Sequence, residues 1–257
     1  MLYLIGIGLS KESLTIEAID ALKKCKEIFI DVYTTTLPFE IKEYENFLKK
    51  VLRKTIRLLV ASREILEEKS QHFLELAKKT DVGLLVYGDP LIATTHFSLI
   101  KDAKKMGIKT RVIHNASIIN GISDIGLSVY KFGKIASMPK WQQGYKPKSF
   151  YHIIKQNLAI GAHTLLLISP ELSFYEALEQ LMHVDRSKKI EKIFVCVKIG
   201  TKDAKIFFDK PENLKKLKNQ KLIKSIEHPF CFVVPASLEW YEEEELKKMK
   251  QNETKWK

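Results

Sequence analysis

Short apolar runs alternate with stretches of helical periodicity along the first part of the chain. Apolar positions at Ile16, Ile19 and Leu22 recur at three-residue intervals, which is typical of an amphipathic helix. Uninterrupted apolar runs are typical of strands buried on both faces. We expect such strands at Leu2–Ile7, Ile28–Val32, 83–87 and Lys109–Ile113, and a short one near Ile56–Val60. This alternation predicts a parallel, doubly wound α/β sheet.

The second part of the chain has a different order of elements. Helices are expected at 149–160, 173–183 and Trp240–Met249, and the tail Gln251–Lys257 is expected to fray. Strands are expected at Ile135–Met138, 163–168, Phe194–Ile199, Lys205–Phe208 and Phe230–Val234. The third and fourth of these follow each other closely, which favours an antiparallel pair and a mixed sheet. We therefore expect two α/β domains, residues 1–114 and 115–257.

The strand 83–87 runs into the sequence Gly88-Asp89-Pro90-Leu91-Ile92-Ala93-Thr94-Thr95-His96. In an open α/β sheet, ligands bind beyond the carboxyl ends of the strands. Gly88 permits a close backbone approach, and Asp89 is a short acceptor for an amine or a hydroxyl. Gly, Asp and Pro are also the usual residues of a plain turn. The loop is thus either a ligand site or an ordinary strand-to-helix turn.

Two further loops follow predicted strands. Gly6-x-Gly8 ends the first strand, and Ser13 is expected to cap the next helix. The third glycine of a dinucleotide fingerprint is replaced by Lys11, which argues against a nicotinamide cofactor. Ser117 is expected to cap a helix running from Ile118. The free backbone N–H groups at this helix start would either meet a ligand or have no role beyond the helix itself.

The seven histidines show no metal-ligand spacing, and no nucleophile–base pair, phosphate-binding loop or G-x-S-x-G motif is present. The residues therefore assign no catalytic side chain and no metal. An enzyme that orients a cosubstrate carrying its own leaving group has no need of such motifs. Methyl transfer from a sulfonium to an amine is a reaction of this kind.

A net charge of +12 raises nucleic acid as a partner, but nearly all of the basic residues are lysines. Arginine, the better reader of bases and phosphates, occurs only at 53, 57, 63, 111 and 186. Solvated lysine-rich helix faces are therefore favoured over a specific nucleic-acid site. Three cysteines without C-x-x-C spacing indicate reduced, buried thiols in a cytoplasmic protein. No apolar run reaches the roughly 18 residues of a membrane span, and no signal peptide is apparent.

Several motifs in register resemble the diphthine synthases, members of the tetrapyrrole-methylase-like class of S-adenosylmethionine methyltransferases. They are the opening strand MLYLIGIGL, GDPLIATTH, VIHNASIIN, KPKSFY and GAHTL, and they run from residue 1 to about 168. The resemblance implies two α/β domains with S-adenosyl-L-methionine in a cleft between them. It assigns the cofactor contacts to Leu9, Asp89, Ile92, Ser117, Ile118, Ile168, Ile199 and Phe230. The family histidine before the last strand aligns with Phe230, whereas His228 lies two residues earlier.

The implied reaction is repeated methylation of the amino group of 2-(3-amino-3-carboxypropyl)-histidine on translation elongation factor 2, giving diphthine. The resemblance also implies a homodimer without metal. Two other functions stay open: a corrinoid or porphyrin-precursor methyltransferase, which five arginines disfavour, and a catalytically idle RNA- or ribosome-binding descendant, which the lysine excess favours. The loop 140–148, with Trp141 and Tyr145 among lysines, is expected either to dock the protein substrate or simply to pack.

Overall fold

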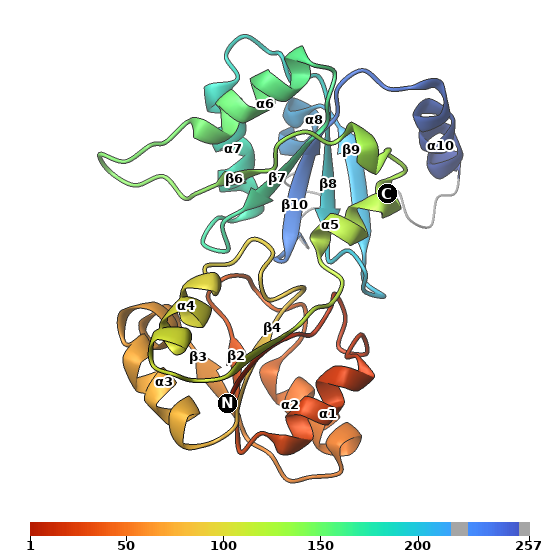
Figure 1. The fold of residues 1–257 in the computed structure, drawn as a ribbon. Coiled ribbons are helices and arrows are strands. Elements are labelled where there is room, and N and C mark those ends of the chain that lie inside the picture. The colour runs from red at the N-terminus through yellow and green to blue at the C-terminus, as the bar shows by residue number, and fades with distance from the viewer. Residues whose placement is uncertain (217–225, 252–257) are drawn as a thin grey trace. The chain divides into compact units, whose positions relative to one another are not determined.

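The computed structural model describes residues 1–216 and 226–251. The chain forms two compact units, Met1–Gly121 and Ile122–Lys257 (Figure 1). The expected first domain, 1–114, ends a few residues before the first unit does, and that boundary stays a prediction. Of the tail expected to fray, residues 252–257 lie outside the described part of the chain.

The first unit contains the predicted parallel sheet, in the order β3-β2-β4-β1-β5. All four pairings are parallel, with Leu4 next to Leu84 on one side and next to Val112 on the other. The strands are β1 (Leu2–Gly6), β2 (Glu27–Asp31), β3 (Leu58–Ala61), β4 (Val82–Val86) and β5 (Thr110–Ile113). Because the strands are parallel, their carboxyl ends share one edge of the sheet.

Helices cover both faces of this sheet, as the alternating pattern predicts. Helices α1 (Ile16–Lys24) and α2 (Ile41–Leu52) lie on one face, and α3 (Ser70–Lys79) and α4 (Phe97–Lys105) on the other (Figure 1). Fully buried side chains such as Tyr44 and Leu48 of α2 pack on the first face, and Leu74 and Leu99 pack on the second. Each buried aliphatic side chain contributes roughly 1.5–3 kcal/mol to folding.

Two expectations about helix starts are corrected. Helix α1 is capped by Thr15, whose hydroxyl accepts a hydrogen bond from the Ala18 amide at 3.1 Å, whereas Ser13 bonds to Ser10. Both residue types cap helices, and the one next to the first helical turn takes the role. The helix expected from Ile118 is a single turn, α5 (Ile118–Gly121), followed by the 3-10 turn η2 (Ile122–Ile125).

The second unit contains the predicted mixed sheet, in the order β6-β7-β10-β8-β9. Only β6 and β7 are parallel, and β8 and β9 form the expected antiparallel pair. The strands are β6 (Ala136–Met138), β7 (Thr164–Ile168), β8 (Ile193–Val197), β9 (Lys205–Asp209) and β10 (Phe230–Val234). The helices are α6 (Ser149–Ala159), α7 (Phe174–Val184), α8 (Pro211–Lys216) and α10 (Trp240–Gln251), with the 3-10 turn η3 (Val129–Lys131).

A buried ionic network attaches α10 to the rest of the second unit. The fully buried Glu242 carboxylate contacts the His163 ring at 3.1 Å and Lys131 Nζ at 3.1 Å, and it accepts the Ser128 amide at 2.9 Å. The Ala236 amide donates to Nδ1 of His163 at 2.9 Å, so the ring proton is on Nε2 and points at Glu242. The network is therefore fully paired with a neutral histidine.

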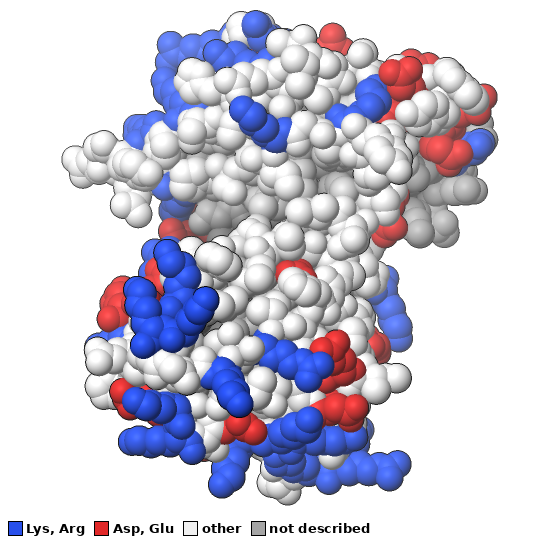
Figure 2. Space-filling view, viewed as in Figure 1, with Lys and Arg blue, Asp and Glu red and all other residues white. Residues whose placement is uncertain are grey.

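The three cysteines are buried and free, as expected. Cys196 and Cys231 lie opposite each other on β8 and β10, and burial raises the pKa of Cys25 to about 12. On the face shown in Figure 2, the Lys and Arg side chains of the first unit are interspersed with Asp and Glu. This distribution agrees with solvated helix faces. No helix among the described residues has the length and apolarity that a membrane crossing requires.

Candidate functional site

Two glycines join the loops that follow β1 and β4. The Gly8 amide donates to the Gly88 carbonyl at 3.1 Å, and the Gly88 amide donates back to Gly8 at 3.0 Å. Both glycines have left-handed backbone, with φ of +73° and +77°, which other residues adopt at a cost. The Tyr87 hydroxyl adds a hydrogen bond to the Leu9 carbonyl at 2.9 Å. These contacts fix Leu9 beside the end of β4.

Asn115 attaches the loop after β5 to the loop after β1. Its amide nitrogen donates to the Gly6 carbonyl at 3.0 Å and to the Ser13 carbonyl at 2.9 Å. A Cβ atom on Gly6 would lie 2.7 Å from the Gly88 oxygen and 2.9 Å from the Asn115 Cβ. Gly6 is therefore required by internal packing. The sequence interpretation did not single out Asn115, because its partners lie about a hundred positions away in the sequence.

Asp89 organises the same loops through its buried carboxylate. Oδ1 accepts the Leu91 amide at 2.9 Å, and Oδ2 accepts the Asn115 amide at 3.2 Å and lies 2.8 Å from Nδ1 of His114. The residue is only 4% exposed. Its side chain is thus an internal acceptor for neighbouring loops, and a ligand at this edge would meet the backbone that Asp89 holds in place.

The other cofactor positions predicted in the first unit lie along the same edge. Ile92 follows Asp89 and is 38% exposed, and Ile118 at the start of α5 is half-buried. Ser117 is buried, and its hydroxyl accepts the Ile119 amide at 3.3 Å. The structure therefore brings the five predicted first-unit residues to the carboxyl ends of three adjacent strands, β4, β1 and β5.

The three predicted positions of the second unit also share one edge of their sheet. Ile168 ends β7, Ile199 lies just beyond β8, and Phe230 begins β10, which runs in the opposite direction. Phe230 is paired with Val197, and its neighbour Cys231 is paired with Leu167. All three side chains are buried, with exposures of 9%, 3% and 6%.

Phe230, the residue aligned with the family histidine, begins β10, and His228 lies two residues before it. The His228 ring stacks on Phe230, with 4.3 Å between centroids, and its Nε2 lies 2.6 Å from the Leu172 carbonyl. Burial lowers the pKa of His228, so it is a neutral donor to that carbonyl. His228 is held in place by contacts within the second unit.

Trp141 in the loop 140–148 contacts its own unit. The indole N–H donates to the Pro147 carbonyl at 3.0 Å, and the ring meets His183 of α7 edge to face at 5.3 Å. Tyr145, in contrast, is 61% exposed. Of the two aromatic residues in this loop, Tyr145 presents the more accessible surface.

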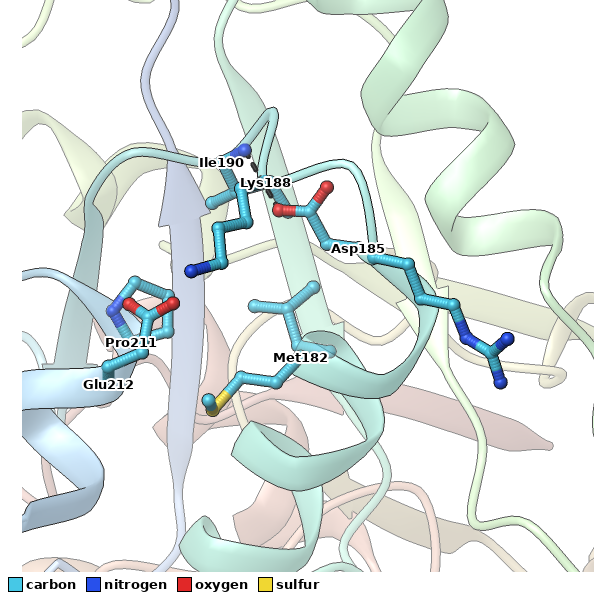
Figure 3. Close-up of a pocket in the computed structure, with 8 residues that line it drawn as sticks. Met182, Asp185, Lys188, Ile190, Pro211 and Glu212 are labelled. Atoms are coloured by element: carbon cyan, nitrogen blue, oxygen red, sulfur yellow. Dashed lines mark hydrogen bonds between the residues drawn. The ribbon is translucent and has the colours of Figure 1, made fainter.

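A pocket of about 150 Å³ lies beside α7 and α8 in the second unit (Figure 3). Met182, Lys188 and Glu212 line it, together with Asp185. The Asp185 carboxylate already accepts the Tyr151 hydroxyl at 2.8 Å and the Ile190 amide at 2.9 Å. None of the predicted cofactor residues lines this pocket. Within the described residues, no cluster of three or more His, Cys, Asp or Glu side chains is arranged to hold a metal ion.

Comparison with known proteins adds independent information. The family model for tetrapyrrole (corrin/porphyrin) methylases matches residues 1–215. A diphthine methyl ester synthase from Schizosaccharomyces pombe is 40% identical over 169 residues, which cover 65% of this chain and 58% of that protein. The human protein of the same name is 38% identical over 183 residues, covering 71% of this chain and 62% of that protein. The chain thus matches less than two thirds of the length of these relatives.

Solved structures extend the likeness over nearly the whole chain. A diphthine synthase crystal structure superimposes with a TM-score of 0.83 at 31% identity, covering 96% of this chain and 95% of that one. A putative diphthine synthase from Entamoeba histolytica gives 0.81 at 29% identity, covering 96% and 97%. The two-sheet architecture expected from the sequence is therefore confirmed.

Proposed function

Because the chain belongs to the tetrapyrrole methylase family, we propose that it is an S-adenosylmethionine-dependent methyltransferase of diphthamide biosynthesis. Its proposed substrate is the modified histidine of translation elongation factor 2. The similarity to two diphthine methyl ester synthases and to the crystal structure of a diphthine synthase supports this proposal. We further propose that the enzyme is cytoplasmic and homodimeric.

The residues at the edge of the first sheet fit an adenosyl cofactor in their chemistry. They offer aliphatic side chains from Leu9, Ile92 and Ile118 together with backbone groups of the three loops, and Asp89 is already paired. Adenine has apolar faces and hydrogen-bonding edges, which such a set accommodates. We propose that these residues, with Ser117 and with Ile168, Ile199 and Phe230 of the second unit, bind the cofactor.

The chain's contribution to the reaction is orientation. When bound, S-adenosylmethionine supplies an electrophilic methyl group on a sulfonium. The Gly8–Gly88 backbone bonds and the Asp89 carboxylate hold the loops in one geometry, so little ordering remains to occur on binding. Holding two reactants in attack geometry can supply roughly 7–11 kcal/mol of the barrier. We assign no catalytic base: an α-amino group with a pKa of about 8 is partly neutral at pH 7, and this neutral fraction can attack the methyl group.

The observation that carries the proposal is the family match over residues 1–215. The predicted cofactor residues of the first unit, which lie at the ends of adjacent strands, agree with it. The test is to incubate the purified chain with S-adenosylmethionine and elongation factor 2 bearing the unmethylated modified histidine. Peptide mass spectrometry then counts the methyl groups on that residue. We expect successive methyl additions on the amino nitrogen.

The names of the relatives raise the question of a methyl ester on the carboxyl group as well. Mild alkaline hydrolysis removes an ester methyl and leaves N-methyl groups in place, so the same spectra separate the two products. Unmodified elongation factor after incubation would refute the proposal. In that case, a steep salt dependence of RNA affinity would support the idle RNA-binding alternative.

A further inference from the structure

A second polar cluster lies on the same sheet edge, beyond the residues proposed to bind the cofactor. We call it the edge cluster, and it consists of Tyr33, Arg63, Glu67 and Thr95. Its members follow β2, β3 and β4, which are adjacent in the sheet, whereas the proposed cofactor loops follow β4, β1 and β5. The loop after β4 belongs to both groups, with Asp89 near its start and Thr95 near its end. The edge cluster therefore adjoins the proposed cofactor site.

The edge cluster is closed by short hydrogen bonds. The Tyr33 and Thr95 hydroxyls are 2.6 Å apart, and each lies within hydrogen-bonding distance of Oε1 of Glu67, at 3.1 Å and 2.7 Å, so two hydroxyl protons are shared among three contacts. Oε2 of Glu67 pairs with Nε of Arg63 at 3.2 Å, and the Arg63 guanidinium lies over the Tyr33 ring at 5.8 Å. Burial, opposed by the Thr95 hydrogen bond, raises the pKa of Tyr33 to about 12, so the phenol remains a donor at neutral pH.

A buried contact between Asp31 and His96 supports the edge cluster. Asp31, at the end of β2, accepts the Tyr33 amide at 2.9 Å and lies 3.1 Å from Nε2 of the buried His96. This contact ties Tyr33 to the loop that carries Thr95. Among the described residues, Nδ1 of His96 has no hydrogen-bond partner, an unusual condition for a buried polar atom. The contacts of Asp31 thus preorganise Tyr33 and the loop that carries Thr95, as a binding site requires.

The exposed part of the edge cluster has one carboxylate, from Glu67, and one guanidinium, from Arg63, which are complementary to the two charged groups of an amino acid. The side chain of Glu67 is 30% exposed and that of Arg63 is 65% exposed. An exposed ion pair of this kind adds little to stability. A carboxylate accepts from an ammonium, and a guanidinium pairs with a carboxylate in a fork geometry.

We propose that the edge cluster binds the amino acid head group of the acceptor, with its amino group at Glu67 and its carboxylate at Arg63. This inference rests on the proposed function, because it specifies the acceptor side of the same site. The substrate class is thus a protein-borne α-amino acid. Both of its ionic groups are read by residues of the first unit.

The chain offers a matched control for each charged member of the edge cluster. Glu68 is the exposed neighbour of Glu67, and Arg57 is exposed just before β3, whereas Arg63 follows it. The test compares Glu67→Gln with Glu68→Gln, and Arg63→Gln with Arg57→Gln, in steady-state methylation of elongation factor 2. Thermal denaturation and the affinity for S-adenosylhomocysteine are measured for every variant.

We expect Glu67→Gln and Arg63→Gln to raise the apparent KM for the factor by roughly 10- to 100-fold, as for a lost hydrogen bond to a charged group. Both control variants should keep the wild-type KM, and every variant should keep the wild-type affinity for S-adenosylhomocysteine. Arg63→Lys should recover part of the loss in KM. Equal KM values in test and control variants would overturn the inference. An equally large loss of S-adenosylhomocysteine affinity in Glu67→Gln and Arg63→Gln would also overturn it. A wild-type chain that binds the product but transfers no methyl would instead refute the proposed function, and this inference with it.

Discussion

Replacing Asp89 by Asn should weaken cofactor binding, although the side chain itself points at neighbouring loops. The carboxylate accepts two backbone amides, from Leu91 on one oxygen and from Asn115 on the other. An amide side chain keeps only one oxygen, so one of these buried N–H groups must face the new NH₂ group. An unpaired buried donor costs about 1–3 kcal/mol. The His114 contact adds less, because that ring is 68% exposed and water replaces the partner.

We therefore expect Asp89→Asn to weaken the binding of S-adenosylhomocysteine by about 1–3 kcal/mol, because the loops that Asp89 holds are displaced. Calorimetry measures this affinity. The melting temperature should fall only modestly, since these loops lie at the edge of the core. Asp102→Asn, an exposed change on α4, is the matched control and should bind normally. His114→Ala should cost less than Asp89→Asn. Wild-type affinity in Asp89→Asn, or an equal loss in His114→Ala, would refute this reasoning.

Three further predictions follow from named contacts. Burial raises the pKa of Glu242, but hydrogen bonds from backbone amides, His163 and Lys131 outweigh it and lower the pKa from 4.5 to about 2. The ionised carboxylate therefore contributes about 3 kcal/mol to the free energy of unfolding above pH 4.5, and this contribution is lost as the pH falls toward 2. Glu242→Gln should flatten this part of the stability–pH curve in denaturant titrations. Gly8→Ala should destabilise the chain more than Gly107→Ala in thermal denaturation, because both have positive φ but only the first Cβ would clash, at 2.5 Å; equal losses would contradict this. Trp141→Ala should lower the melting temperature, because the indole loses its hydrogen bond to Pro147, and should keep the S-adenosylhomocysteine affinity within about 0.5 kcal/mol of the wild-type value. Unchanged stability would favour a docking role for Trp141.

The strands were predicted well from the sequence because each buried strand is a short run of consecutive apolar residues. Leu2 to Ile7 and Val82 to Val86 are continuous apolar runs, and no other element type accounts for such short runs between glycines and turns. The parallel first sheet and the mixed second sheet followed from the change in element order after the first hundred residues. These features depend on neighbours in the sequence.

The roles of single polar residues were less predictable because they depend on distant partners. For Asp89 the sequence left a ligand site and an ordinary turn open, and its contacts with residues 114 and 115 become visible only once β4 and β5 end at the same edge. Tyr33 and Thr95 are separated by 62 positions, and no local pattern joins them. Ser13 and Thr15 are equivalent cap residues by type, so the choice between them depended on where the helix begins.

The most direct test of the proposed cofactor site is a crystal structure of this chain with S-adenosylhomocysteine. We predict that the ligand contacts the backbone of Leu9, Ile92 and Ile118 at the carboxyl ends of β1, β4 and β5. Density for the ligand in the pocket beside Asp185, or anywhere away from that sheet edge, would contradict the assignment.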